Sequence, residues 1–386
     1  KFSVENRYDY LNLNTCRFLW KQVKFPQATD ASNTAAQVLK EGEVQGSDVA
    51  AHSAGVLDIK TNILANTDAL YLTAIDKYGH ELWRWTFPVD KLNQQTEPIS
   101  FLSIRPTYTE TENDLTVKAN KRTFIFSKKD GQLKGVSVDN RKISFANGPR
   151  FIGARRADRS LDQFYNHDDE KAKEKDRTYS EFPDAAVFTK LDVKQEGGNL
   201  IVTANYKLGN LDKAQWTISP SGDLVLDYTY NFSGVVDLMG ICFDYPEDQV
   251  ISKRWLGAGP YRVWQNRIHG TQYDVWENDY NDPIPGETFT YPEFKGYFGD
   301  VSWMNIRTKE GIISLTNETP DAYVGVYQPR DGRDRLLYTL PESGISLLNV
   351  IPPVRNKVNS TDLCGPSSQP KWVNGPQTGR IVFRFI

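Results

Sequence analysis

Aromatic and cationic side chains gather in and beside one stretch of the sequence, residues 255–303, in which glycines recur throughout. Flat aromatic faces can stack on the C–H faces of sugar rings, while cationic and amide groups hydrogen-bond to sugar hydroxyls. The same aromatics would equally fill the core of a β-protein, with the glycines forming its turns. Composition leaves both interpretations open for the side chains concerned, which are Arg254, Trp255, Arg262, Trp264, Arg267, His269, Trp276 and Trp303.

Two groups of acidic residues have the side chains of a metal site but not its spacing. Residues 167–170, His-Asp-Asp-Glu, are consecutive and lie in a highly charged run, 158–182, so we expect a solvated loop rather than convergent ligands. Asp279, Asn281 and Asp282 offer oxygen ligands, but their pattern does not continue as a calcium-binding EF-hand loop does. The sequence therefore predicts no metal site and no cofactor.

Acid–base chemistry on a sugar requires a general base and a general acid, usually a histidine and a carboxylate, in one cleft. The chain contains 4 histidines, of which only His269 lies within the aromatic stretch. A carboxylate partner such as Glu277 or Glu293 is not placed beside it by the sequence. His80 falls in the turn of a predicted hairpin and is expected to be solvated. The pattern therefore predicts no catalytic residue.

Length and charge narrow the possible functions. A chain of 386 residues with 39% hydrophobic and 25% charged residues is expected to form two globular domains. The net charge of −3 comes without a basic block, so nucleic-acid binding has no electrostatic basis. No apolar run is long enough to span a bilayer. The 3 cysteines, Cys16, Cys242 and Cys364, form no disulfide framework.

Short strands are expected to position these residues. In residues 1–95, strand-like runs separated by turns predict a sandwich, and a polar, proline-flanked segment at 88–100 marks the domain boundary. In residues 96–386, runs such as 200–206 alternate apolar and polar side chains and are joined by glycine-containing turns. The fold class is therefore all-β, with a second domain formed by one large antiparallel sandwich of two extended sheets.

Two glycine–proline motifs resemble the C-terminal part of family 2 glycoside hydrolases of the β-galactosidase type. Residues 257–260, G-A-G-P, followed by Arg267 and Gly270, are similar to a segment near the middle of the last domain in that family. Residues 148–151, G-P-R-F, resemble the start of its G-P … R-A-P-x-D-N-D stretch. These motifs mark the family.

Further motifs agree with the resemblance, with some departures. Residues 156–162 read R-A-D-R-S-L-D where the family usually has R-A-P-x-D-N-D. Pro292, Glu293 and Gly296, followed by V-S-W at 301–303, resemble its P-Q-E-x-G … V-x-W, without the glutamine. Because the sequence opens on a strand-like run without an initiator methionine or signal peptide, we expect a piece of a longer polypeptide.

The resemblance implies an immunoglobulin-like β-sandwich over residues 1–95 and a galactose mutarotase-like β-supersandwich over residues 96–386. It implies a β-galactoside or related glycan as ligand and an N-terminal catalytic barrel of the same polypeptide as partner. It also favours a periplasmic or secreted location and leaves a homo-oligomer open. The candidate carbohydrate contacts are Tyr261, Trp264, Arg267, His269, Arg156, Asp158 and Trp372.

Glycoside hydrolysis requires two carboxyl groups facing each other across the scissile bond. In family 2 enzymes both are glutamates of a (β/α)8 barrel, and this sequence has no such strand–helix alternation. We therefore expect a C-terminal accessory and carbohydrate-binding portion that supports hydrolysis by a barrel absent from this chain. Two alternatives are an independent aldose epimerase of the mutarotase type and a free-standing carbohydrate-binding module.

Overall fold

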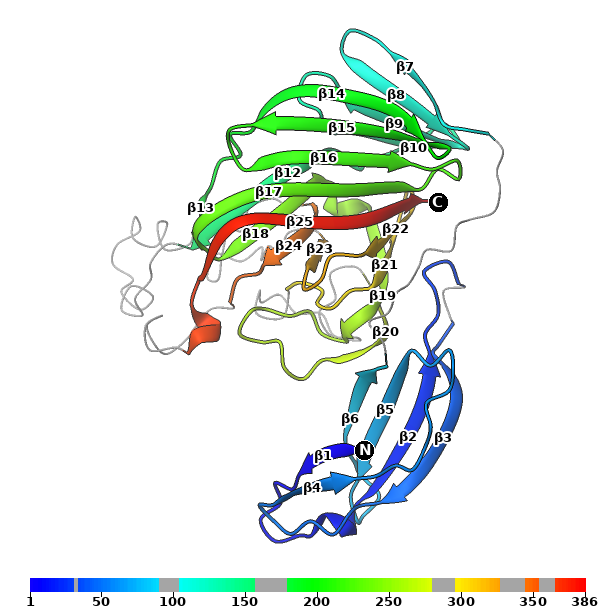
Figure 1. Cartoon of the computed structure of the whole chain (residues 1–386), viewed down its shortest axis with the longest axis vertical. Helices are drawn as coiled ribbons and strands as arrows, with labels where there is room; N and C mark the ends of the chain where they lie inside the picture. The colour runs from blue at the N-terminus through cyan, green and yellow to red at the C-terminus, as the bar shows by residue number, and fades with distance from the viewer. Residues whose placement is uncertain (31–33, 90–103, 157–178, 280–295, 327–343, 354–364) are drawn as a thin grey trace. The chain divides into compact units, whose positions relative to one another are not determined.

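The regular secondary structure of the described residues consists of β-strands and a few short 3-10 turns (Figure 1). The computed structural model describes residues 1–30, 34–89, 104–156, 179–279, 296–326, 344–353 and 365–386. These residues contain short 3-10 turns but no α-helix, and hence no helix that could cross a membrane. Contacts divide the chain into two compact units: unit 1 comprises Lys1–Thr96 and Gln272–Val275, and unit 2 comprises Glu97–Thr271 and Trp276–Ile386.

Unit 1 is built from two antiparallel sheets. Apolar side chains of both sheets, such as Leu57 and Phe18, share one buried cluster. The hairpin expected around His80 is present, and its turn includes Gly79 with a φ of 91°, a value that glycine adopts without strain. The first sheet pairs β1 (Phe2–Glu5) with β4 (Ala54–Leu57), and the second has the order β3 (Gln37–Gln45), β2 (Arg17–Lys24), β5 (Ala69–Ile75), β6 (Glu81–Pro88).

Unit 2 contains two much larger antiparallel sheets. The ten-stranded sheet has the order β23-β24-β18-β12-β10-β9-β8-β7, with β11 and β13 paired to its side, and the nine-stranded sheet has the order β14-β15-β16-β17-β25-β22-β21-β19-β20. The strands of the first are β7 (Thr107–Glu110), β8 (Asp114–Ala119), β9 (Arg122–Ser127), β10 (Leu133–Val138), β11 (Arg141–Ile143), β12 (Ala146–Arg156), β13 (Tyr179–Glu181), β18 (Leu238–Asp244), β23 (Tyr323–Val326) and β24 (Ile345–Val350). Those of the second are β14 (Val187–Glu196), β15 (Asn199–Lys207), β16 (Leu211–Ile218), β17 (Leu224–Val236), β19 (Val250–Gly259), β20 (Gln272–Asp279), β21 (Trp303–Thr308), β22 (Gly311–Asn317) and β25 (Lys371–Phe385).

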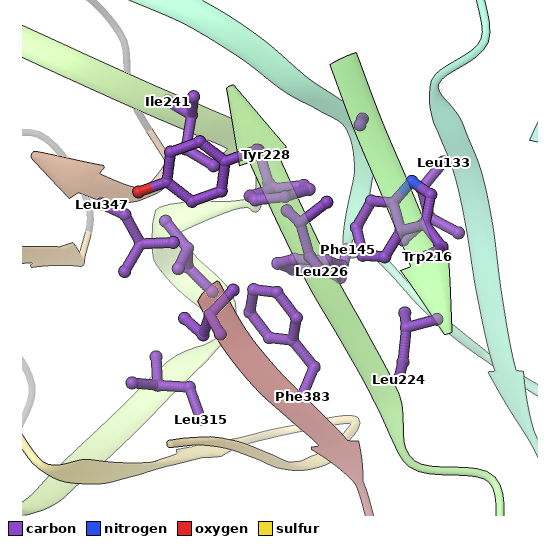
Figure 2. Close-up of a cluster of buried hydrophobic side chains, with 14 of the residues drawn as sticks. Leu133, Phe145, Trp216, Leu224, Leu226, Tyr228, Ile241, Leu315, Leu347 and Phe383 are labelled. Atoms are coloured by element: carbon purple, nitrogen blue, oxygen red, sulfur yellow. The ribbon is translucent and has the colours of Figure 1, made fainter. Parts of the chain in front are cut away.

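The inner faces of these two sheets form one hydrophobic core. In β17 the side chains of Leu224, Leu226 and Tyr228 are buried and alternate with less buried neighbours, as expected where one face of a strand packs on the core. Figure 2 shows these side chains meeting Trp216, Phe383 and residues of the other sheet. The prediction of an all-β fold with a large antiparallel β-supersandwich is confirmed.

Strands β18 and β24 differ from β17 because the side chains on both of their faces are buried. One face contributes to the core between the sheets, and the other is covered by a second cluster that includes Val263 and Tyr297. The ten-stranded sheet is therefore covered at this position on its outer face as well, which is where the candidate residues of the aromatic stretch lie.

Several sequence predictions fall outside the described residues. They are Asp158, the cluster 167–170, Asn281, Asp282, Glu293 and Cys364. The immunoglobulin-like assignment of residues 1–95 stays a prediction.

Candidate functional site

The candidate site is built where the segment after β19 covers the outer face of the ten-stranded sheet. Val263 and Tyr297 exchange backbone hydrogen bonds of 2.7 and 2.9 Å, which fixes the two segments side by side. Their side chains pack with Ile152 of β12, Leu238 of β18 and Leu348 of β24. Because three strands support it, the segment is held by packing rather than by its own turn alone.

Trp264 is a packing residue of this cluster. Its side chain is only 4% exposed, and its ring meets the Tyr297 ring edge-on at a centroid distance of 5.6 Å. A sugar ring cannot stack on an aromatic face that is already covered. As it is placed here, the Trp264 ring packs against the rest of unit 2, and the carbohydrate contact expected of Trp264 stays a prediction.

Three of the predicted contact residues, three to five positions from Trp264 in the sequence, lie at the surface. Tyr261 is 46% exposed, and Arg267 and His269 are also exposed. A hydrogen bond of 2.8 Å from the Arg267 N–H to the Trp264 carbonyl closes a tight turn between them. The buried tryptophan therefore anchors a surface segment that presents three of the predicted contact residues.

The same segment is hydrogen-bonded to the chain just before β25. The Gln265 side-chain amide donates to the carbonyls of Ser367 and Gln369 at 2.8 and 2.6 Å, and Asn266 donates to the Ser368 hydroxyl at 3.3 Å. Trp372 lies near the start of β25, directly after these residues, and is 71% exposed. The two stretches that carry Tyr261 and Trp372 are thus in direct contact, although no sequence pattern pairs them.

A polar pair that sequence reasoning did not single out lies on β12 and β18. The Arg150 guanidinium donates to an Asp244 carboxylate oxygen at 2.5 Å, and the Asn147 amide donates to the other oxygen at 2.7 Å. Burial raises the pKa of Asp244, but the hydrogen bonds from Arg150 and Asn147 outweigh it and leave the pKa below its ordinary value. Asp244 is therefore an anion at neutral pH, and the G-P-R motif at 148–150 was the available signal for this pair.

Cys242 is buried beside this pair, and its surroundings make the thiol unreactive. Its Sγ is 3.8 Å from Arg150, but burial raises the pKa of the thiol to about 11 despite the neighbouring cation. A thiol in that state is protonated at neutral pH and a poor nucleophile. Cys16 in unit 1 is buried and unbridged as well.

Two further cationic side chains in or beside the stretch, Arg254 and Arg262, are buried within unit 2. Arg254 lies over the Trp303 ring at 5.2 Å, and Arg262 lies over the Phe298 ring at 5.8 Å. Both arginines are thus cation–π partners of core aromatics in this structure. They are not surface donors for sugar hydroxyls.

The glycines and tryptophans that mark the family are mainly architectural. Trp255 is fully buried and donates a hydrogen bond of 2.9 Å to the Ala258 carbonyl, while Trp276 donates to the Gly257 carbonyl at 3.2 Å. A Cβ atom on Gly259 would come within 2.4 Å of the Trp276 ring, so only glycine fits there. The core interpretation of these aromatics applies to Trp255, Trp264 and Trp303.

No catalytic pair is formed among the described residues of this site. Of the described histidines, His52 and His80 lie in unit 1, with ring nitrogens 3.2 and 3.3 Å from the carboxylates of Asp9 and Asp76. The described residues contain no group of three metal-binding side chains. For Arg156 only the backbone is described, which pairs with Tyr179 in the sheet.

A sequence profile of the family described as Beta galactosidase small chain matches residues 118–350, more than half of the chain. The chain belongs to this family. The matched region includes β12, β18 and β24 and the segment that carries Tyr261 and Arg267. No curated protein matches its sequence.

Solved structures of low sequence identity align with about three quarters of the chain. Galactose 1-epimerase from Lactobacillus acidophilus is 10% identical, with a TM-score of 0.41, over 74% of this chain and 99% of that chain. The aldose epimerase homologue from C. elegans is 7% identical, with a TM-score of 0.32, over 73% of this chain and 99% of that chain. Likeness at these values says nothing about activity.

Proposed function

We propose that this protein is the C-terminal accessory and carbohydrate-binding portion of a family 2 glycoside hydrolase. The observation that carries the proposal is the family match over residues 118–350. Hydrolysis itself needs two opposed carboxyl groups, which a (β/α)8 barrel supplies in enzymes of this kind. The barrel is expected on the N-terminal side of this chain in the same polypeptide. The accessory portion then contributes sugar contacts and structural support rather than the acid and the base.

Aromatic rings at the surface of the candidate site support the sugar-binding part of the proposal. Tyr261 and Trp372 expose large ring areas on two segments that are hydrogen-bonded to each other. Arg267 and His269 follow Tyr261 on the same surface segment and can donate hydrogen bonds to hydroxyls. The substrate class is a β-galactoside or a related glycan.

The first test is hydrolysis by the isolated chain. We expect no release of nitrophenol from a nitrophenyl β-galactoside above the rate of a buffer control, because the acid and the base lie in the barrel. Absorbance of nitrophenolate provides the measurement. Release that a single Glu→Gln substitution in this chain abolishes would contradict the proposal.

The second test is binding at the surface rings. Tyr261→Ala and Trp372→Ala should each weaken the binding of a β-galactoside about fivefold, because one stacked ring contributes about 1 kcal/mol. NMR titration of the isolated chain measures these dissociation constants. Tyr108→Ala is the matched control, since Tyr108 is 44% exposed in β7 of unit 2, outside the site. If all three variants bind as the parent chain does, neither ring contacts the sugar.

A further inference from the structure

An open hollow lies within unit 1, between its two sheets. Its volume is about 760 Å³, and it is lined by the consecutive residues 2–8 together with Leu82, Trp85 and Phe87 of β6 and buried residues of β2 and β5. Lining by consecutive residues means that the backbone of β1, and not just one row of its side chains, borders the hollow. Phe2 and Phe87 meet at one end, with ring centroids 4.8 Å apart.

Two of the strands that border the hollow, β1 and β6, have an unpaired edge among the described residues. β1 pairs with β4 alone, and β6 pairs with β5 alone. An unpaired edge presents a row of backbone N–H and C=O groups that readily pair with another extended chain. The sheet that contains β1 has two described strands, whereas its partner sheet has four.

The face of β6 that borders the hollow is apolar and only partly covered. Trp85 and Phe87 stand opposite Leu72 and Leu70 in the register of β5, so all four side chains project from the same face of the sheet. Leu70 and Leu72 are buried in the core of unit 1, but Trp85 and Phe87 are 41% and 37% exposed. The core-facing side of this sheet is therefore buried over β5 and only partly covered over β6.

Three of the polar side chains around the hollow, those of Glu5, Asn6 and Arg7, already have partners within the unit. The Asn6 amide donates to the carbonyls of Leu11 and Val49 at 2.8 and 2.9 Å, and Arg7 and Glu5 form an ion pair of 2.9 Å. A sugar or other polar small molecule would find few side-chain groups to bind its hydroxyls. Backbone edges and apolar side chains are what the hollow offers, and both suit an extended peptide.

We propose that the hollow receives a β-strand from the same polypeptide, on the N-terminal side of Phe2, which pairs antiparallel with the free edge of β1. This inference rests on the proposed function, in which the barrel precedes this chain. Sequential strands are usually neighbours in a sheet, and a sandwich of the predicted immunoglobulin-like type has roughly seven strands. A strand of about five residues with alternate apolar side chains would cover Trp85 and Phe87.

Amide hydrogen exchange in the whole encoded polypeptide and in the 386-residue chain tests the proposal. In the whole polypeptide, the amides of β1 should exchange at least about tenfold more slowly, because an added strand would protect them. The proposal would be overturned if the shorter chain exchanged more slowly only at high protein concentration and sedimented as a dimer. That result would show that a second copy of the chain covers the edge. Slower exchange produced by an added β-glucan or galactoside, or equal exchange in both chains, would also overturn the proposal.

A substitution in the hollow provides an independent readout. Trp85→Glu should lower the unfolding midpoint of unit 1 more in the whole polypeptide than in the 386-residue chain, where the side chain is 41% exposed. Tyr78→Glu is the control, because Tyr78 is 73% exposed in the turn between β5 and β6 and should be neutral in both. Equal effects of Trp85→Glu in the two chains would contradict an added strand. Neither measurement depends on hydrolytic activity, so a failed barrel assignment and a failed strand assignment are distinguishable.

Discussion

Replacement of Trp255 by alanine is expected to lower the free energy of unfolding of unit 2 by about 3–5 kcal/mol, the range for deleting a fully buried large aromatic side chain. Trp255 is fully buried in β19, and its ring meets the Phe298 ring edge-on at 4.9 Å. Its indole N–H also donates to the Ala258 carbonyl at 2.9 Å. The substitution would leave a cavity and remove that hydrogen bond at the start of the candidate segment. Urea denaturation followed by circular dichroism measures the loss.

Trp372→Ala provides the matched control for this prediction. It removes the same side chain from the same sheet, but the ring is 71% exposed, so the expected change is within about 0.5 kcal/mol. Equal losses from the two substitutions would show that the burial of Trp255 is not what stabilises unit 2.

The sequence predicted the fold class well because strand patterns are local. In β17 the apolar residues Leu224, Leu226 and Tyr228 recur at every second position, and the structure turns all three to the core. The hairpin around Gly79 likewise follows from a turn residue between two apolar runs. Such signals require no knowledge of distant segments.

Burial in the aromatic stretch was harder to predict because it depends on distant segments. Trp264 follows the exposed Tyr261 by three positions, yet it is buried because Tyr297 and three strands of the other sheet cover it. Arginine side chains usually lie at the surface as hydrogen-bond donors, but Arg254 and Arg262 each lie over a core aromatic ring. Residue type alone does not say which side of a strand or turn faces the core.

The contacts that assemble the candidate site have large sequence separations. Arg150 and Asp244 are 94 residues apart, and Gln265 and Ser367 are 102 residues apart. Both pairs meet because the strand order places β12 beside β18 and brings the start of β25 against the segment after β19. Without the topology, the sequence could identify the motifs but could not predict which of them lie in contact.

The family motif identifies architecture rather than chemistry. Gly257 and Gly259 are required because their neighbours leave no room for a side chain, and Trp255 and Trp276 hydrogen-bond to the backbone of the same segment. A motif of this kind assigns the fold, and function must be argued from side chains that a ligand can reach. This is why the binding tests address Tyr261 and Trp372.

Gly240→Ala is expected to lower the free energy of unfolding of unit 2 by about 3 kcal/mol, at the upper end of the cost of overpacking. Gly240 lies in β18 between β12 and β24, and a Cβ atom there would come within 2.0 Å of the Leu347 carbonyl oxygen and 2.7 Å of Leu348 Cα. Both neighbours are backbone atoms, which cannot rotate aside as a side chain can. The strands would have to separate, which would weaken their hydrogen-bond ladder and displace the outer face that supports the candidate segment.

Gly135→Ala separates this steric effect from the general effect of adding a methyl group to a strand glycine. Gly135 lies in β10 of the same sheet, and the nearest atom to its added Cβ would be Ile125 Cδ1 at 4.0 Å, an ordinary contact. Its replacement should be neutral or should stabilise unit 2 by about 0.4–1 kcal/mol, because alanine restricts the unfolded chain. Denaturation midpoints of both variants measure the difference. If Gly240→Ala is as stable as Gly135→Ala, strands β18 and β24 do not approach as closely as this structure has them.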